Sequence, residues 1–479
     1  MLRDVLLQRA ETDSNRLAFA HDDEQVTFAQ LAERSRSRAA ALAARHGIGH
    51  GDRVAVVMSA GIPLVETVWA CQLLGAAPAV LNPSLPDPIL SRRTRLIRPS
   101  LVVTDDLVRA ERPASDCPAE PSIGSDDLAF LQLTSGTSGA PRASMILQRN
   151  VIAYLDSSRT GTTLSPDDVL VSWVPPWHDL GLVRFVIGPV YVGASCHIVA
   201  PAIRTIPEWI QTISRVHGTY SAAPDFAARL AVRMVDPTSV DLGSLRCLKL
   251  GAEPIRLSTI ELFESTFGTP GAVVPGYGLG EATLGVCEHL PGEHVPIDEQ
   301  GNVSCGLPNR GLEVHAGRPG APSEILVRGP SIFAGYFDAP EETRAKLREG
   351  WLHTGDLGYI DASGRLFVLG RREGMIKRAG TVIAPLELEE AAERVEGVRI
   401  AAVTTVSGAD GEIVVVAIET GGSADRSDEQ IAADVSRELV ASVGFAPGRV
   451  SVLPRRTIPR TENGKIRHGH LREMLEAGV

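Results

Sequence analysis

The sequence has no excess of positive charge and no closely spaced cysteine pairs. Its 479 residues carry a formal net charge of -11, which argues against a general nucleic-acid binder, although a few glycines and an arginine can still form a local phosphate site. None of the six cysteines forms a Cys-x-x-Cys pair. We therefore expect reduced thiols rather than a disulfide framework or a zinc site.

The sequence also lacks a segment suited to span a membrane. Its longest apolar tract, at 61–81, contains Pro63 and Glu66, so we interpret it as a buried helix followed by a strand. The N-terminal residues MLRDVLLQRAETD hold acids in their first turns and lack a small-residue cleavage pattern, which argues against a signal peptide. We therefore expect a soluble, cytoplasmic protein with no membrane or nucleic-acid partner.

Apolar periodicity predicts an α/β fold. A chain of 479 residues is too long for one core, so two or three packed units are expected. Residues 27–47 place apolar side chains on one face of a helix that ends at Gly47. RVAVVM at 53–58 is typical of a strand buried on both faces. Similar runs alternate with helical stretches up to about residue 300, which predicts two α/β subdomains with mostly parallel sheets.

The pattern of predicted secondary structure changes after about residue 301. Short strands punctuated by glycine predict a small β-barrel at about 301–371, which completes a large N-terminal domain over 1–371. Helical patterns at 386–395 and 428–442 flank two strand-like runs, so 374–479 is predicted to form a small α+β domain.

The stretch LQLTSGTSGAPR at 131–142 crowds hydroxyls and glycines at one turn. It is not a Walker A loop, because Pro141 stands where that motif requires its second glycine, and no Lys-Ser pair follows. By composition alone it could be a flexible surface turn. It could equally present consecutive backbone N–H groups and hydroxyls to an anion, since glycines allow close backbone approach.

Seven stretches, in this order, resemble the motifs of the adenylate-forming superfamily of acyl-CoA synthetases, peptide-synthetase adenylation domains and luciferases. TSGTSGAPR at 134–142 resembles the phosphate loop of that superfamily. The other stretches are VPPWHDLGL (174–182), LGAEPI (250–255), GYGLGEAT (276–283), WLHTGDLG (351–358), GRREGMIKRAGTVIAPLELE (370–389) and PRTENGK (459–465). VPPWHDLGL is similar to a stretch typical of fatty acyl-AMP ligases. The resemblance covers nearly the whole chain.

The resemblance implies a nucleotide site. The ATP β- and γ-phosphates would be bound by Thr134, Ser135, Gly136, Thr137, Ser138 and Gly139, with Arg142 beside them. The adenine would stack on Tyr277 and be flanked by Gly251, Ala252, Glu253, Gly276 and Gly278. Asp356 would accept hydrogen bonds from the ribose hydroxyls with the help of Arg371, and Glu281 would bind Mg²⁺.

The resemblance also implies catalytic residues on a mobile C-terminal domain. Lys465 would contact the substrate carboxylate and the α-phosphate, where an ammonium opposes the charge that develops during attack. Glu373 would be the hinge, and Lys377 and Gly380 would serve the thioester stage. His178 would lie near the acyl pocket.

Several of these residues have a plain structural alternative. Tyr277 could be a packed core aromatic, Asp356 a turn former, and His178 a satisfied core histidine. Lys465 could be solvated if Asn-Gly-Lys is only a turn. Glu281 is harder to explain as a structural residue, because a buried acid among apolar neighbours requires a partner.

The sequence departs from the family pattern in ways that bear on the reaction. Arg142 stands where lysine is usual, Gly280 where Thr or Ala is usual, and Gly374 follows the hinge residue, which puts the rate of adenylation in question. Acyl-AMP ligases usually carry an insertion before the Thr-Gly-Asp motif, whereas TRAKLREGWLHTGD runs straight through here. We therefore expect CoA rather than a carrier protein as the acceptor.

The sequence predicts an ATP- and Mg²⁺-dependent ligase that converts a carboxylic acid to an acyl-adenylate and then to a CoA thioester. The acid is expected to be hydrophobic, because Val174, Leu182, Phe226 and Leu284 are expected near the pocket. Three alternatives stay open: loading of an acyl carrier protein, thioester transfer from a preformed acyl-adenylate without adenylation, and a non-catalytic nucleotide-binding protein.

Overall fold

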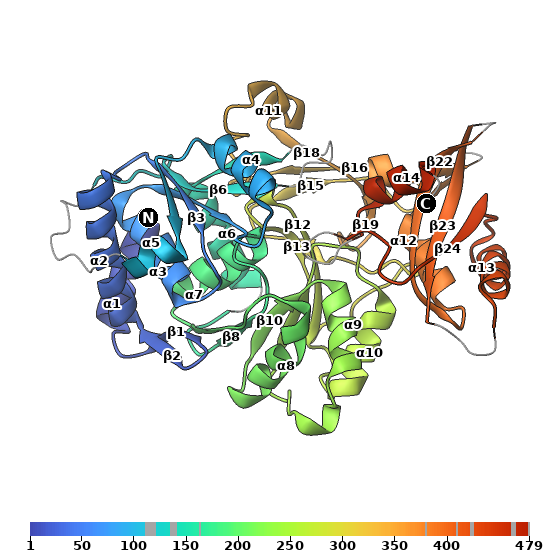
Figure 1. Ribbon diagram of the computed structural model, residues 1–479, viewed down its shortest axis with the longest axis horizontal. Helices are drawn as coiled ribbons and strands as arrows, with labels where there is room; N and C mark the ends of the chain where they lie inside the picture. The colour runs from blue at the N-terminus through green and yellow to red at the C-terminus, as the bar shows by residue number, and fades with distance from the viewer. Residues whose placement is uncertain are drawn as a thin grey trace.

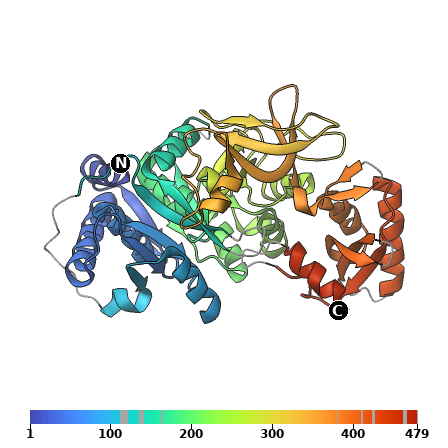
Figure 2. The same ribbon diagram turned by 90° about the horizontal axis from the view of Figure 1, so that it is seen from above.

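The computed structural model describes residues 1–110, 121–134, 141–161, 164–378, 381–408, 411–421, 426–460 and 466–477. Along its longest axis the chain forms an N-terminal α/β unit, a central region and a C-terminal unit at the opposite end (Figures 1 and 2). In the described part of the chain, no helix is long and apolar enough to cross a bilayer.

The central sheet has nine strands in the order β14-β13-β12-β11-β10-β8-β9-β1-β2. Its strands are β1 (Leu17–His21), β2 (Glu24–Thr27), β8 (Val169–Ser172), β9 (Ser195–Ile198), β10 (Tyr220–Ala223), β11 (Cys247–Leu250), β12 (Val273–Gly278), β13 (Gly285–Glu288) and β14 (Leu307–Pro308). From β12 to β1 all neighbours are parallel, and the outer pairs are antiparallel. The mostly parallel arrangement predicted from the apolar runs is confirmed here.

Helices cover this sheet and bury its apolar side chains. On one side lie α8 (Ile206–Arg215), α9 (Asp225–Met234) and α10 (Leu257–Phe267), whose buried residues form a core with β8, β10 and β11 (Figure 1). The other helical elements of the central region are α6 (Gln148–Gly161), the π-helix η1 (Leu180–Ile187), α7 (Gly188–Val192), and the 3₁₀ turns η2 (Ile203–Thr205), η3 (Pro237–Ser239) and η4 (Gly280–Ala282).

The N-terminal unit contains a parallel sheet in the order β4-β3-β5 and an antiparallel hairpin. The strands are β3 (Arg53–Val57), β4 (Ala77–Leu81), β5 (Leu101–Thr104), β6 (Leu128–Thr134) and β7 (Arg142–Leu147); the helices are α1 (Leu2–Thr12), α2 (Phe28–His46), α3 (Ile62–Leu74), α4 (Asp87–Ile97) and α5 (Asp105–Ala110). Helix α2 ends at Gly47 in the left-handed conformation, as glycine allows. The buried Glu66 of α3 pairs with Arg38 at 2.6 Å, which offsets the cost of burying its charge.

A five-stranded antiparallel sheet follows the central sheet. It consists of β15 (Glu313–His315), β16 (Ser323–Arg328), β17 (Leu347–Arg348), β18 (Trp351–Ile360) and β19 (Leu366–Arg371), with helix α11 (Pro340–Lys346) beside β17 and β18. Strand β18 pairs with three others, so the Thr-Gly-Asp turn of the sequence lies within a central strand of this sheet. Lys346 and Trp351 are joined by the short strand β17 and a two-residue turn.

The C-terminal unit has its own apolar core. After the 3₁₀ turn η5 (Arg372–Gly374) its elements are β20 (Ile376–Arg378), β21 (Thr381–Ile383), α12 (Pro385–Glu393), β22 (Val398–Gly408), β23 (Gly411–Thr420), α13 (Asp428–Val443), β24 (Arg449–Leu453) and α14 (His468–Glu476). Strands β22, β23 and β24 form one sheet, packed between helices as Figure 1 shows.

Candidate active site

A cavity of about 2500 Å³ opens where the central region meets the five-stranded sheet and the C-terminal unit. Many of the residues that the sequence singles out line it. They are Arg142, His178, Gly251, Ala252, Glu253, Gly276, Tyr277, Gly278, Glu281, Asp356 and Arg371. These residues come from separate stretches of the chain, so the fold gathers the motifs around one space.

Some predicted residues lie outside the part of the chain that the structure describes. They are Ser135, Gly136, Thr137, Ser138, Gly139, Gly380 and Lys465, together with the side chains of Thr134, Glu373 and Lys377. The segments beside two of these gaps are well placed: Thr134 and Arg142 pair as the last and first residues of β6 and β7. Arg460 and Ile466, on either side of the segment that holds Lys465, line the cavity.

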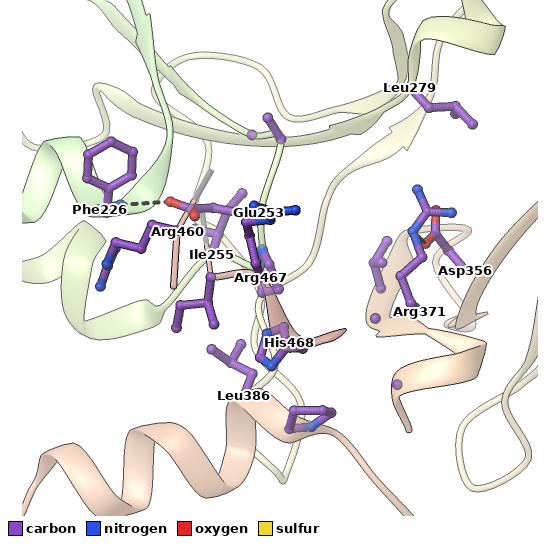
Figure 3. Close-up of a pocket in the computed structure, with 18 of the residues that line it drawn as sticks. Phe226, Glu253, Ile255, Leu279, Asp356, Arg371, Leu386, Arg460, Arg467 and His468 are labelled. Carbon is purple, nitrogen blue, oxygen red and sulfur yellow. Dashed lines mark hydrogen bonds and ion pairs between the residues drawn. The ribbon is translucent and has the colours of Figure 1, made fainter. Parts of the chain in front are cut away.

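Tyr277, Asp356 and Arg371 form a hydrogen-bonded group on one wall. Tyr277, near the end of β12, donates from its hydroxyl to Asp356 Oδ2 at 2.6 Å. Arg371 Nε lies 3.0 Å from Asp356 Oδ1, because Asp356 and Arg371 are direct neighbours in the β18–β19 ladder. Figure 3 shows Arg371 next to Asp356, away from the side chains around Glu253.

The Asp356 carboxylate is 6% exposed, and burial raises its pKa although Arg371 and Tyr277 act in the opposite direction. Lys346, also on the cavity wall, donates from Nζ to the carbonyl oxygens of His353 and Thr354 at 3.1 Å each. Burial lowers the pKa of this lysine. The sequence analysis did not identify Lys346 as a residue of the site. The pattern that could have identified it is a lysine ten residues before the aspartate of the Thr-Gly-Asp motif.

Glu281, Tyr336 and Arg142 form a second group. Glu281 lies on η4 and accepts a 2.6 Å hydrogen bond from the buried Tyr336 hydroxyl. The Arg142 guanidinium lies over the Tyr336 ring, with its carbon 5.5 Å from the ring centroid, within the range of a cation–π contact. This contact connects β7, the strand after the predicted phosphate loop, to the acid predicted to hold Mg²⁺.

The donor set fits Mg²⁺ as a nucleotide-bound ion. Among the described residues, no group of three or more His, Cys, Asp or Glu side chains is arranged to hold a metal by itself. Glu281 therefore offers one carboxylate, and Mg²⁺ commonly uses one or two carboxylates together with substrate phosphates.

The LGAEPI stretch crosses the opposite side of the cavity. Ala252 adopts a φ of 69°, a left-handed conformation that costs free energy for a residue other than glycine. Glu253 accepts a hydrogen bond from the backbone N–H of Phe226 at 2.8 Å, at the start of α9 (Figure 3). A side chain used in this way caps a helix, so Glu253 has a structural role besides any contact with adenine.

His178 begins the turn that leads into η1. Its Nδ1 lies 2.5 Å from Asp179 Oδ1, and its backbone N–H donates to Pro175 O at 3.1 Å. Gly181 comes so near this turn that a Cβ there would lie 2.0 Å from Pro175 O. The Pro-Pro-Trp-His-Asp-Leu-Gly spacing therefore holds the His178 ring at the cavity by a close backbone contact that only glycine permits.

The apolar residues expected at the pocket divide into two sets. Val174 and Phe226 line a smaller apolar pocket next to His178, and both Phe226 and Leu284 line the main cavity. Leu182 is 1% exposed, belongs to the main hydrophobic core, and lines neither of these pockets. Leu182 lies within the π-helix η1, where a residue's direction does not follow the usual 3.6-residue period.

Ion pairs connect the C-terminal unit to the central region at the rim of the cavity. Arg229 Nη2 on α9 lies 2.9 Å from Glu393 Oε2 at the end of α12. Arg256 lies 3.8 Å from Glu393 and 3.7 Å from Glu390, and it also pairs with the buried Asp225. Figure 3 shows Arg460, Arg467 and His468 of the C-terminal unit facing Glu253 and Ile255.

Comparison with known proteins gives one consistent assignment. The AMP-binding enzyme family matches residues 6–337. "Putative ligase Rv1013" of Mycobacterium tuberculosis is 32% identical, with 93% of each chain covered. "Medium-chain-fatty-acid--[acyl-carrier-protein] ligase JamA" of Moorena producens is 27% identical over 99% of this chain and 92% of its own. A solved chain from a study of fatty acyl-adenylate ligases from E. coli and L. pneumophila superposes with a TM-score of 0.86 at 26% identity, covering 100% of this chain and 97% of its own. With its motifs gathered around one cavity, this chain belongs to the AMP-binding enzyme family, the adenylate-forming acid–thiol ligases.

Proposed function

We propose that the protein is an acyl-CoA ligase that works in two steps within this cavity. In the first step a carboxylate oxygen attacks the α-phosphorus of ATP, and pyrophosphate leaves. In the second step the thiol of CoA attacks the acyl carbon, its proton is lost, and AMP leaves with the carboxylate oxygen it received. The observation that carries the proposal is the convergence of Tyr277, Asp356, Glu281 and His178 on one cavity.

Each group has a role in the first step. Tyr277 stacks on the adenine, Asp356 accepts hydrogen bonds from the ribose hydroxyls, and the residues of the TSGTSG loop bind the terminal phosphates. Glu281 would hold Mg²⁺, which would supply positive charge to neutralise the phosphates. Lys465, delivered by the C-terminal unit, stabilises the charge that develops at the α-phosphate. The residues beside it, Arg460 and Ile466, already line the cavity, which fits this orientation of the C-terminal unit to adenylation.

The C-terminal unit then rotates about Glu373 and brings the segment of Lys377 and Gly380 to the cavity for thioester formation. Conformational steps of this kind let one site serve two transition states. The domain division near this residue agrees with the separate apolar core of the C-terminal unit.

We propose CoA as the acceptor because nothing is inserted between α11 and β18. Only the two residues of β17 and a turn separate Lys346 from Trp351. Arginines such as Arg233 and Arg399 also line the cavity, which suits a polyphosphorylated thiol. The named activity of the Moorena relative makes an acyl carrier protein the second candidate acceptor.

Two assays separate the alternatives. Acid-dependent release of pyrophosphate from ATP, measured over a panel of acids, tests adenylation; thioester formation from synthetic acyl-AMP tests transfer, with CoA and a phosphopantetheinyl carrier protein compared at equal concentration. We expect pyrophosphate release and faster reaction with CoA. Thioester from acyl-AMP without pyrophosphate release would indicate a transfer enzyme, and reaction with the carrier protein alone would replace CoA. Neither activity would indicate a nucleotide-binding protein.

A further inference from the structure

Three charged side chains meet at the inner end of the cavity. Lys249 on β11, Glu288 on β13 and Arg184 on η1 all line it, and their side chains are 8%, 2% and 1% exposed. Lys249 Nζ lies 2.6 Å from Glu288 Oε2, and Arg184 Nη2 lies 3.2 Å from Glu288 Oε1. We call these three residues the inner charge cluster. The motifs of the sequence do not include them.

The inner charge cluster holds two cations against one carboxylate. Burial alone would raise the pKa of Glu288, but Lys249 and Arg184 outweigh this effect and keep the pKa below its usual value, so the carboxylate is ionised. The neighbouring Tyr154 and Tyr220 stay neutral because burial raises their pKa values.

Two further groups near the cluster can carry charge. Burial raises the pKa of Cys247 to about 11, so its thiol is protonated. Asp179, the next carboxylate on the cavity wall, is in contact with His178 and the backbone N–H of Leu180. Burial lowers the pKa of Lys249, and the attraction of Glu288 opposes that effect. With both bases protonated, the cluster carries one positive charge that its own carboxylate does not balance.

Arg184 and Lys249 differ in the number of their hydrogen-bond acceptors. Arg184 donates to the Ser158 and Tyr154 hydroxyls as well as to Glu288, and its guanidinium lies over two aromatic rings. Lys249 Nζ contacts Glu288 and has no further hydrogen-bond acceptor among the residues that the structure describes. An ammonium carries three donors, and leaving a buried charge with few partners is costly. Lys249 is therefore suited to receive an oxygen acceptor from the cavity.

The ammonium lies immediately behind the strand that carries Tyr277. A Cβ at Gly276 would lie 2.9 Å from Lys249 Cε and 3.2 Å from Nζ, and a Cβ at Gly285 would lie 2.4 Å from Glu288 Oε1. Glycine at both positions thus leaves room for the cluster beside β12 and β13, and its three side chains line the cavity. Leu284, between the nucleotide motif and Gly285, also lines the cavity. The cluster accordingly borders the space next to the predicted nucleotide site, where the acyl part of the substrate would lie.

Lysine at this position is unusual for this chain. Of its 47 basic residues only four are lysines, Lys249, Lys346, Lys377 and Lys465. An ammonium is a compact charge, whereas the planar guanidinium is wider, so the close approach of Gly276 suits lysine here.

We propose that Lys249 binds a second anionic oxygen group of the acid substrate, so that the enzyme selects acids with a carboxylate besides the one that is activated. This inference rests on the proposed function, because it assumes that an acid occupies this cavity. With the second carboxylate bound, the inner charge cluster holds two cations and two anions, so its charges balance. Leu284 and the apolar wall contact the carbon chain.

The test compares matched acids on matched variants. Linear monocarboxylic acids and α,ω-dicarboxylic acids of equal carbon number are assayed for kcat/KM of pyrophosphate release with wild type, Lys249→Met and Glu288→Gln. We expect wild type to prefer one chain length of diacid over its monoacid by about 10- to 100-fold, the value of a hydrogen bond to a charged group. Lys249→Met should remove that preference, and Glu288→Gln, which removes the carboxylate that competes with the substrate for Lys249 Nζ, should increase it.

Two results would overturn the proposal while leaving adenylation intact. Wild type could use monoacids and diacids equally, with Lys249→Met unchanged. Alternatively, Lys249→Met could lose activity on monoacids and diacids to the same extent, which would mean that Lys249 binds the carboxylate that reacts.

A binding measurement keeps the inference separate from catalysis and from folding defects. Acyl sulfamoyladenosines, which mimic the acyl-adenylate and cannot react, are titrated calorimetrically with and without a terminal carboxylate. Tighter binding of the carboxylate form by wild type, lost in Lys249→Met and increased in Glu288→Gln, supports the inference even if no acid releases pyrophosphate. Equal binding of the two forms by wild type contradicts it. Equal affinity of wild type and Lys249→Met for AMP confirms that the variant is folded.

Discussion

The Tyr277 hydroxyl donates a 2.6 Å hydrogen bond to the Asp356 carboxylate, which lies 79 residues further along the chain. This contact connects the end of a parallel strand in the central sheet to a strand of the five-stranded antiparallel sheet. The residue proposed to stack on adenine and the residue proposed to bind ribose are thus positioned by each other. The proposed nucleotide site therefore depends on the packing of the two sheets.

Asp356→Asn should weaken AMP binding by about 10- to 100-fold, because a charged acceptor for the ribose hydroxyls is replaced by a neutral amide. Calorimetric titration with AMP measures the loss. Tyr277→Phe, which keeps the ring and removes only the hydroxyl, serves as the control and should lose less. Equal AMP affinity in Asp356→Asn and wild type would remove Asp356 from the site.

The same substitution has a predictable effect on the stability of the nucleotide-free protein. The surroundings raise the pKa of Asp356 above its ordinary value of 3.8, so ionisation destabilises the folded state as pH rises through the raised value. The neutral amide that replaces this carboxyl in Asp356→Asn does not titrate. The stability of Asp356→Asn relative to wild type should therefore increase from strongly acidic to neutral pH. Thermal unfolding across that range tests the sign, and a relative stability that falls as pH rises would contradict it.

Arg142→Lys should slow pyrophosphate release about two- to five-fold. The guanidinium lies over Tyr336, whose hydroxyl holds Glu281, and loss of a cation–π contact is worth about 0.5–1 kcal/mol. Steady-state assays at saturating acid measure the rate. The opposite result, faster release by the lysine variant, would mean that arginine at this position impairs adenylation, as the departure from the family motif suggests.

Gly181→Ala should destabilise the protein by about 1–3 kcal/mol, because a Cβ there lies 2.0 Å from a backbone oxygen that cannot move freely. Gly469→Ala is the matched control, since nothing lies within 4 Å of a Cβ at that helical position. It should be neutral or slightly stabilising. Denaturant unfolding gives both values, and similar values for the two variants would refute the close-contact explanation of the His-Asp-Leu-Gly turn.

Glu393→Gln should slow pyrophosphate release more than it slows thioester formation from synthetic acyl-AMP. Glu393 pairs with Arg229 and Arg256 and so favours the orientation in which Arg460 and Ile466 border the cavity. The pair is partly exposed, and its effect on global stability should stay below about 1 kcal/mol. Glu396→Gln removes an exposed charge from the same region and should leave both rates unchanged. Equal slowing of the two half-reactions would show that the ion pairs do not select an orientation.

The fold was predictable where local patterns determine it. RVAVVM became β3, and the residues before Gly47 became a helix ended by that glycine, because burial on both faces and a left-handed cap each leave a local signal. That Asp356 and Tyr277 lie at one site was predictable only from the resemblance to the adenylate-forming superfamily. No local sequence pattern indicates which distant strands lie side by side.

The inner charge cluster shows why other residues of the cavity were not predicted from the sequence. Lys249 stands between two leucines in a buried strand, and no local sequence pattern predicts its contact with Glu288 or the proximity of Arg184. Likewise Leu182 was expected at the pocket, but the π-helix places it in the core. Side-chain direction in such segments depends on tertiary packing rather than on periodicity.

Isotope transfer tests the central claim most directly. The acid found to release pyrophosphate is labelled with oxygen-18 in its carboxylate and incubated with ATP, Mg²⁺ and CoA. If that carboxylate attacks the α-phosphorus and a thiol then displaces AMP, mass spectrometry will find one labelled oxygen in the AMP produced. Unlabelled AMP, or label in inorganic phosphate, would contradict an acyl-adenylate route.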